Sequence, residues 1–208
     1  MASSMHRLLV AGLLTGLAGA PASAQRVAAL KPGDAVPKPV ELDTTGMFQA
    51  KFTKVGDDLF VAGQPTERGL REMKARGVTT VVNLRSPQEM DRVGFDEAAL
   101  VRQLGMKYVY LPMRGTPELP YSPKAVESFA AALASADGKV LLHCTVAWRA
   151  SHLWSAYLIQ DRKLPVAEVL ASTRLINLMD EHHTGADKQP LEEFLGRMVP
   201  ELGHAKMQ

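Results

Sequence analysis

The sequence predicts an α/β fold in which a mostly parallel central sheet is flanked by helices. Short runs rich in β-branched and aromatic residues alternate with segments of helical periodicity, which is typical of such sheets. A cysteine also follows the last apolar run directly, where sheets of this kind bind ligands, beyond the carboxyl ends of their strands. The expected strands are 59–62, 79–84, 107–111 and 140–143, and the expected helices are 67–75, 95–104, 124–136, 151–160, 166–178 and 191–198.

Turn and capping residues define the elements of the first half. Residues 63–65, Gly-Gln-Pro, turn the chain after the first strand, and Thr66 can cap the helix expected over 67–75. Gly77 ends that helix. The β-branched run 79–84 then reads as a strand.

The second half follows the same alternation. Gly105 closes the second long helix, and the alternating residues 107–111 form the next strand. Residues 112–123 form a loop with four prolines. The apolar stripe of 124–136 indicates a helix that ends before Gly138, and the last strand leads directly into the cysteine.

The first 24 residues are expected to be a signal peptide. Arg7 supplies a positive start, residues 8–20 are apolar but too short to span a bilayer, and residues 22–24 read Ala-Ser-Ala, a cleavage site. The mature chain is then expected to begin at Gln25 and to be periplasmic or secreted. The alternative is a retained membrane anchor.

Composition predicts one mature domain. We expect an extended leader at 25–52, a catalytic domain at 53–200 and a C-terminal tail at 201–208. The net charge of +2 falls to about +1 when Arg7 is removed, so it gives no indication of nucleic acid or of an acidic membrane surface as partner. We also expect no stable membrane insertion after signal cleavage.

Cys144 is the only cysteine among 208 residues. In an oxidising compartment it has no internal disulfide partner, so it is either a buried inert side chain or a functional thiol. Its place between a strand and a helix favours function. A loop there collects backbone N–H groups and the positive end of a helix, which bind an oxyanion and stabilise a thiolate. Arg149 closes that loop.

This loop resembles that of the cysteine-dependent protein tyrosine and dual-specificity phosphatases. Four residues separate Cys144 from Arg149, a spacing that resembles the bacterial beta-lactamase-hydrolase-like branch. The likeness extends to the segments 63–66, 81–85 and 96–100 and covers roughly 59–159. It implies a phosphatase-like fold with the active-site loop at the carboxyl edge of the sheet.

The resemblance implies a role for each residue of the site. Cys144 is the nucleophile that forms a phosphocysteine, Arg149 grips the phosphate, and Glu118, the only carboxylate of the Pro-rich loop, is the general acid. No metal or other cofactor is implied, because arginine and backbone amides carry the anionic charge. The partner is a phosphorylated protein or small molecule. The remaining expected substrate-binding residues are His143, Thr145, Val146, Ala147, Trp148 and Arg85.

Several residues allow a second interpretation. His143 is otherwise a satisfied strand-end histidine, Glu118 a solvated loop residue and Arg85 a surface residue. At least one of Trp148 and Trp154 is expected to be packing. The remaining set, read as turn or solvated helix-end residues rather than as a site, is Gln64, Asp180, Glu181, His182 and His183.

The loop also departs from the phosphatase pattern. Ala147 stands where glycine is common, Trp148 is large for a phosphate cradle, and Ala150 replaces the usual hydroxyl residue. Two other functions therefore stay open. The short loop also resembles that of a rhodanese-type sulfurtransferase, and loss of the acid would leave a non-catalytic phosphate-binding protein.

Overall fold

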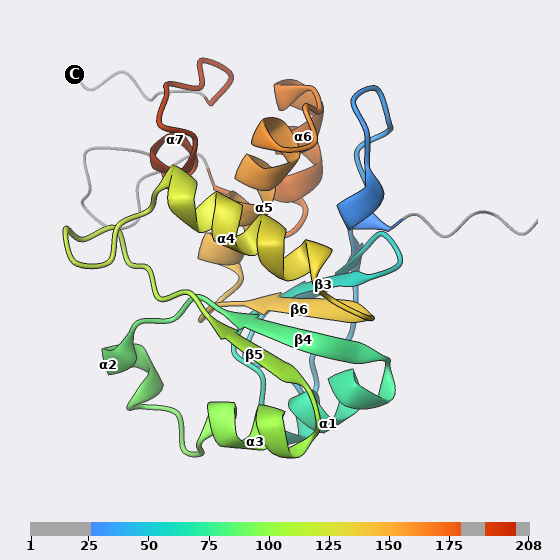
Figure 1. Cartoon of the computed structure of the whole chain (residues 1–208), viewed down its shortest axis with the longest axis vertical. Helices are drawn as coiled ribbons and strands as arrows, with labels where there is room; N and C mark the ends of the chain where they lie inside the picture. The colour runs from blue at the N-terminus through green and yellow to red at the C-terminus, as the bar shows by residue number, and fades with distance from the viewer. Residues whose placement is uncertain (1–25, 180–189, 203–208) are drawn as a thin grey trace, which may run out of the picture.

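The computed structural model describes residues 26–179 and 190–202, and within them one six-stranded sheet (Figure 1). The strand order is β1-β2-β3-β6-β4-β5, and β3, β6, β4 and β5 are parallel. The mostly parallel sheet predicted from the sequence is confirmed. The strands are β1 (Val40–Glu41), β2 (Phe52–Val55), β3 (Leu59–Ala62), β4 (Val78–Asn83), β5 (Lys107–Tyr110) and β6 (Lys139–His143).

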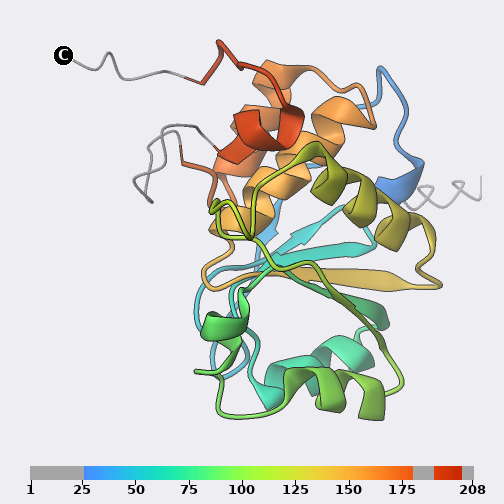
Figure 2. The ribbon, with the colours of Figure 1, turned by 60° about the vertical axis from the view of Figure 1, so that its left-hand side comes forward.

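Helices cover both faces of the sheet. One face carries α1 and α3, and the other carries α4, α5, α6 and α7 (Figures 1 and 2). Each face has its own apolar core. The helices are η1 (Val27–Ala29, a 3₁₀ turn), α1 (Glu67–Ala75), α2 (Pro87–Met90), α3 (Glu97–Gln103), α4 (Pro123–Ala134), α5 (Trp148–Gln160), α6 (Val166–Arg174) and α7 (Pro190–Leu195).

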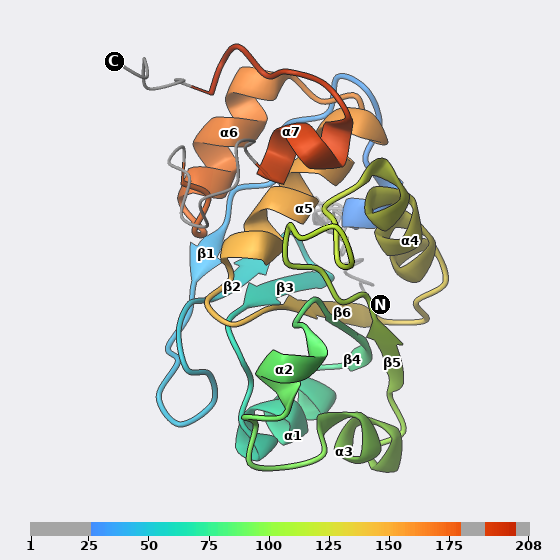
Figure 3. The ribbon, with the colours of Figure 1, turned by 90° about the vertical axis from the view of Figure 1, so that its left-hand side faces the viewer.

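The end of β6 lies at the centre of the carboxyl edge. His143, the last residue of β6, pairs with Ala62 of β3 on one side and with Asn83 of β4 on the other. Figure 3 looks onto this edge, where α2 and the start of α5 lie on opposite sides of the strand ends. The residues that follow β3, β4 and β6 therefore meet around Cys144.

The predicted leader takes part in the fold. Within 25–52, strand β1 pairs antiparallel with β2, and Val27, Phe48 and Phe52 are buried. The carboxylate of Asp58 holds this segment by accepting hydrogen bonds from Val27 N at 2.8 Å and Arg26 Nε at 3.1 Å. The expected boundary at 53 is wrong, because it cuts β2.

Helix α5 begins three residues earlier than expected. It starts at Trp148, so Arg149 lies in its first turn rather than at the end of the loop. The helix is buried on nearly every side, because α4, α6 and α7 all pack around it (Figure 1). A buried helix shows little amphipathic periodicity, which explains why the pattern located its start poorly.

Some predictions lie outside the described residues. These are the signal peptide, most of the tail and the segment 180–183. Among the residues described, no helix has the length and apolar character required to cross a bilayer.

Candidate active site

Residues 144–147 form a tight loop whose carbonyl groups point to flanking segments. Thr145 O accepts a hydrogen bond from Gln64 N at 3.0 Å, and Val146 O accepts one from Asn177 Nδ2 at 2.6 Å. The C=O and N–H groups of a trans peptide point in opposite directions, so the N–H groups of Val146 and Ala147 point away from these partners. This is the orientation that an oxyanion cradle requires.

Two small residues allow the loop to adopt this shape. A Cβ atom on Gly63 would lie 2.9 Å from Thr145 O, so only glycine lets the end of β3 approach so closely. Ala147 has φ 66°, a left-handed conformation that favours glycine. The alanine therefore keeps the backbone shape of a glycine at some cost in strain.

Cys144 lies at the inner end of the loop, with 1% of its surface exposed. Its backbone N donates to Ala62 O at 3.3 Å. Burial disfavours the charge on Arg149, yet Cys144 and the Glu89 carboxylate together raise the pKa of that guanidinium. The Cys144 side chain and the guanidinium therefore lie within electrostatic range of one another.

The end-on fork of Arg149 is occupied by Glu89, a residue that the sequence did not single out. Arg149 Nη2 donates to Glu89 Oε1 at 2.5 Å, and Nη1 donates to Glu89 Oε2 at 2.9 Å. Nη1 also donates to Leu84 O and Met113 O, at 3.1 and 2.7 Å. Nη2 reaches back to Thr145 Oγ1 at 3.1 Å. These hydrogen bonds hold Nη1 and Nη2, the outer atoms of the guanidinium, in a fixed position beside the loop.

One N–H group of Arg149 remains for a ligand. No acceptor in the part of the chain that the structure describes takes Nε–H. The sequence predicted that the arginine grips phosphate with a fork. Among the described residues, Glu89 and Thr145 take both N–H groups of Nη2 and Glu89 holds the end-on edge, so the structure leaves Nε–H for that contact.

Glu89 is positioned by a capping box on α2. Ser86 Oγ accepts from Glu89 N at 3.3 Å, and Glu89 Oε2 accepts from Ser86 N at 2.8 Å. Burial alone would raise the pKa of Glu89, but the hydrogen bonds and charge of Arg149 lower it to about 2. Glu89 is therefore an anion at neutral pH and has no proton to donate. The S-x-x-E spacing of Ser86 and Glu89 was the available signal.

His143 belongs to a buried network beneath the loop. Its Nε2 lies 3.0 Å from Glu97 Oε1, and both side chains are fully buried. Glu97 also accepts from Asn83 Nδ2 at 3.0 Å and from Gln64 Nε2 at 2.6 Å. Burial would raise the pKa of Glu97, but His143, Gln64 and Tyr108 hold it below its usual value. His143 is thus a positioned strand-end residue whose carboxylate partner comes from α3.

Arg85 links the buried network of His143, Glu97 and Gln64 to Glu89 on α2. Its Nη1 donates to Gln64 Oε1, and its Nη2 donates to the backbone oxygen of Glu89 at 2.9 Å. The side chain is 6% exposed, and burial lowers its pKa. The alternative of an arginine paired on the surface is wrong, because Arg85 is buried, and Gln64 is more than a turn residue.

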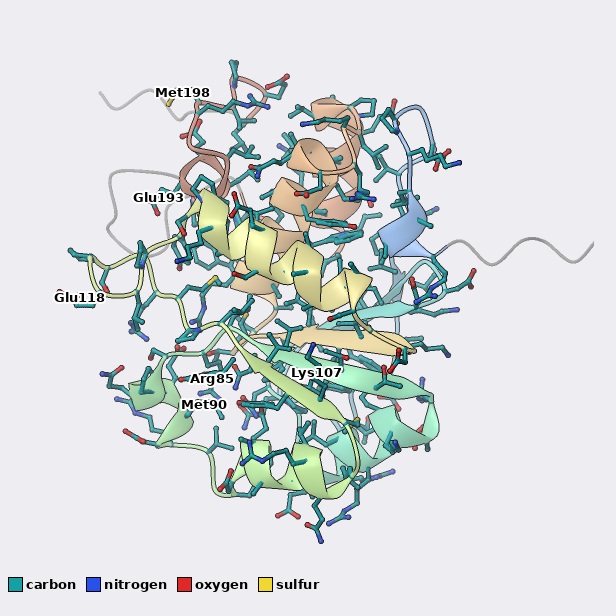
Figure 4. The ribbon with its side chains drawn as sticks, in the orientation of Figure 1. Arg85, Met90, Lys107, Glu118, Glu193 and Met198 are labelled. Carbon is teal, nitrogen blue, oxygen red and sulfur yellow. The ribbon has the colours of Figure 1, made fainter. Side chains whose placement is uncertain are left out.

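Glu118 lies apart from this cluster. It is exposed and points outward from the Pro-rich loop (Figure 4). It lines a hollow of about 420 Å³ that Glu89, Arg92 and Arg114 also line. Its role as general acid stays a prediction.

The aromatic and hydroxyl residues of α5 are packed inward. Trp154 is fully buried and stacks on Tyr157 with ring centroids 5.5 Å apart, which confirms that one tryptophan is packing. Trp148 is 7% exposed and packs edge-on against His152. Ser151 Oγ donates to Trp148 O at 2.7 Å, so its hydroxyl is engaged within the helix.

Comparison with known proteins gives three kinds of match. A family model for the phosphatase-like domain of beta-lactamase hydrolase-like protein matches residues 51–160. Beta-lactamase hydrolase-like proteins of Xylella fastidiosa strains Temecula1 and 9a5c are 29% and 28% identical over 123 residues, 58% of this chain and 28% of each relative. The chain thus spans little more than a quarter of the length of these relatives.

Solved structures show the same fold. The DUF442 protein of Shewanella putrefaciens CN-32 is 27% identical with a TM-score of 0.54, over 77% of this chain and 97% of its own. TpbA of P. aeruginosa has a TM-score of 0.53 at 16% identity, over 82% of this chain and 95% of its own, which shows the fold alone. Since the family model covers more than half of the sequence, the chain belongs to the family of the phosphatase-like domain of beta-lactamase hydrolase-like protein.

Proposed function

We propose that the chain is an exported phosphatase that hydrolyses a phosphomonoester through a phosphocysteine intermediate. One observation carries the proposal: Cys144 directly follows β6, and Arg149 returns within one helical turn to donate to Thr145 Oγ1 at 3.1 Å. Nucleophile, backbone amides and guanidinium therefore surround one position. Family membership supports the phosphatase class.

The reaction would proceed in two displacements at phosphorus. The Cys144 thiolate attacks the phosphorus in line, an S–P bond forms, and the P–O bond to the alcohol or phenol breaks. The leaving oxygen takes a proton from Glu118 or from water. Water then attacks the phosphocysteine, the S–P bond breaks, and inorganic phosphate and the thiolate are released. The loop amides and Arg149 stabilise the negative charge of both transition states.

Phosphotyrosine is the first substrate to test. TpbA, which has a TM-score of 0.51 to this chain in its phosphotyrosine complex, holds that ligand. A phosphorylated protein or a small phosphate ester would present the same dianion to the loop. The proposal therefore covers phosphomonoesters, with phosphotyrosine as the leading case.

A non-catalytic phosphate-binding protein is the second candidate. Two observations favour it: Glu118 is exposed, and Glu89 already occupies the end-on fork of Arg149. A rhodanese-type sulfurtransferase is favoured by the four residues between Cys144 and Arg149 and by the segment 84–89, which resembles rhodanese sequences.

One assay separates the three functions. Purified protein is tested on p-nitrophenyl phosphate, on a phosphotyrosine peptide and on thiosulfate with cyanide, and binding of orthovanadate or phosphate is measured in parallel. We expect phosphate-ester turnover that Cys144→Ser abolishes while anion binding survives, because only the thiolate is nucleophilic. Thiosulfate turnover would indicate the sulfurtransferase, and binding without turnover the non-catalytic protein.

Export is tested separately from catalysis. We propose that residues 1–24 are removed on export, on the basis of the apolar run and the Ala-Ser-Ala site. Mass spectrometry of the chain expressed with its leader should find an N-terminus at Gln25 in the periplasmic or secreted fraction. A full-length chain retained in the membrane would indicate an anchor instead.

A further inference from the structure

A second hollow of about 350 Å³ lies between α2, the start of α3 and the edge strand β5. It shares no lining residue with the hollow beside Glu118. Met90, which is labelled in Figure 4, projects from α2 on this side. The lining residues are Pro87, Met90, Asp91, Phe95, Asp96, Glu97, Ala98, Tyr108 and Tyr110.

One wall of this hollow is aromatic. Tyr108 and Tyr110 lie on the same face of β5, and their rings stack with centroids 6.2 Å apart and planes 14° apart. Phe95 adds a third ring. Tyr110 is 39% exposed, so a ligand has access to this wall. Aromatic faces attract cations through their quadrupole.

The hollow is electronegative. No lysine or arginine lines it, whereas three carboxylates do. Asp96 is used as the N-cap of α3, where it accepts from Ala99 N at 2.9 Å, and Glu97 belongs to the His143 network. The carboxylate of Asp91 has no hydrogen-bond or ion-pair partner among the residues described. Burial and the charges of nearby carboxylates, Asp91 included, raise the pKa of Tyr110.

We propose that this hollow binds the guanidinium of an arginine side chain of the phosphorylated protein substrate. The inference rests on the proposed function, because it names a feature of that substrate. A planar guanidinium stacks on the tyrosine wall and donates two parallel hydrogen bonds to the Asp91 carboxylate, geometry that a lysine ammonium does not supply. Charge and shape of the hollow both select this group.

The hollow lies close enough to the cysteine loop for one peptide to reach both. Met90 and Asp91, which line the hollow, directly follow Glu89 in the chain, and the Glu89 carboxylate accepts from Arg149 Nη2 and from Thr145 Oγ1 of the cysteine loop. An extended peptide advances roughly 3.3 Å per residue. The arginine is therefore expected within a few residues of the phosphorylated side chain.

A binding experiment tests the hollow without relying on catalysis. N-acetyl-Gly-Arg-Gly-amide and the same peptide with citrulline, which keeps the shape but lacks the charge, are titrated while the ring NMR signals of Tyr108 and Tyr110 are followed. We expect saturable shifts with the arginine peptide and none with the citrulline peptide. Equal shifts from both peptides, or none from either, would overturn the inference whatever the enzymatic activity.

A kinetic experiment tests its use in catalysis. Phosphotyrosine peptides carrying arginine or citrulline at each of several offsets are compared in the wild type, in Asp91→Asn and in Asp137→Asn, an exposed aspartate next to the start of β6 that serves as control. At the best offset we expect kcat/KM to favour arginine roughly tenfold in the wild type and the control. Asp91→Asn should remove most of that preference.

The kinetic results distinguish a failure of the proposed phosphatase function from a failure of the arginine subsite. All three proteins should hydrolyse p-nitrophenyl phosphate equally, because that ester does not reach the hollow. If the wild type did not hydrolyse p-nitrophenyl phosphate, the proposed phosphatase function would be refuted. Intact activity with no arginine preference, or with an equal preference in Asp91→Asn, would refute the arginine subsite alone.

Discussion

The carboxylate of Glu89 and the guanidinium of Arg149 form a two-pronged ion pair, with N–O distances of 2.5 and 2.9 Å. Both side chains are largely buried, with 14% and 9% of their surfaces exposed. The same carboxylate caps α2 and accepts from Thr145 Oγ1 at 2.7 Å. Glu89 therefore links α2, the cysteine loop and the first turn of α5.

Replacement of Glu89 should weaken the fold in a pH-dependent way. Its pKa is lowered from 4.5 to about 2 in the folded protein, so its stabilising contribution is complete above about pH 4.5 and is lost as the pH falls toward 2. Glu89→Gln should lower the free energy of unfolding at pH 7 by roughly 1–3 kcal/mol and by much less at pH 3.

Urea denaturation at the two pH values measures this difference. Glu72→Gln is a matched control, because Glu72 pairs with Arg76 on the half-exposed surface of α1. Its effect should stay near 0.5 kcal/mol or below, at about the size of an exposed i,i+4 pair. An equal effect of the two substitutions would show that the Glu89–Arg149 pair contributes no more than a surface pair.

Arg149→Lys should lose most activity although the charge is kept. A single ammonium replaces neither the Nε–H contact to phosphate nor the two-pronged bond to Glu89. We expect kcat/KM for p-nitrophenyl phosphate to fall on the order of ten- to a thousand-fold. Thermal unfolding of the same preparation separates lost chemistry from lost folding. Rates near those of the wild type would assign Arg149 a structural role.

Glu118→Gln tests the general acid through the leaving group. If Glu118 protonates the departing oxygen, the variant should slow hydrolysis of alkyl phosphates roughly 10²-fold or more. It should barely affect p-nitrophenyl phosphate, whose phenolate leaves without a proton. The two substrates are compared at one pH in both proteins. Equal small effects would leave Glu118 a solvated loop residue and move the search for the acid elsewhere.

Glu97→Gln should disturb the cysteine loop through its contact with His143. A neutral amide removes the charge opposite His143 and offers one acceptor oxygen where Gln64, Asn83 and His143 now share two. We expect a loss of roughly 2–4 kcal/mol in stability and a lower kcat with little change in KM, because His143 supports Cys144 without touching substrate. Glu127→Gln, on the exposed side of α4, is the control.

A loss of stability in Glu97→Gln without any change in kcat would mean that the network serves folding alone. The two readouts are therefore taken on the same protein, at a temperature well below the unfolding midpoint of the variant. A parallel fall in kcat would assign Glu97 as a positioning residue for the cysteine loop.

The sequence predicted the parallel part of the fold because the local strand and helix patterns there alternate as they do in a parallel sheet flanked by helices. The four strands β3, β4, β5 and β6 are apolar or β-branched runs, α1 and α3 carry side-chain caps, and α4 carries an apolar stripe. Strands β1 and β2 were missed, because a short edge pair in a Pro-rich segment has no periodicity to detect. The pairing of β1 with β2 is decided by tertiary contacts.

The sequence predicted the cysteine loop of the candidate site but missed the two carboxylates, Glu89 and Glu97, that contact its residues. Cys144 and Arg149 are only five positions apart, so spacing alone brings them together. Glu89 and Glu97 come from other elements, and only the packing of α2 and α3 against the strand ends places them beside Arg149 and His143. Contacts between residues so far apart in the sequence cannot be predicted from a local sequence pattern.

Helix α2 has only four residues, fewer than an isolated helix needs to be stable in water. Its stabilising contacts include the Ser86–Glu89 cap and the bonds that join Glu89 to Arg149 and Thr145. If α2 opened, the guanidinium would lose its two contacts with Glu89 and keep those with Leu84 O, Met113 O and Thr145 Oγ1. The stability of this one turn is therefore coupled to how firmly the arginine is held.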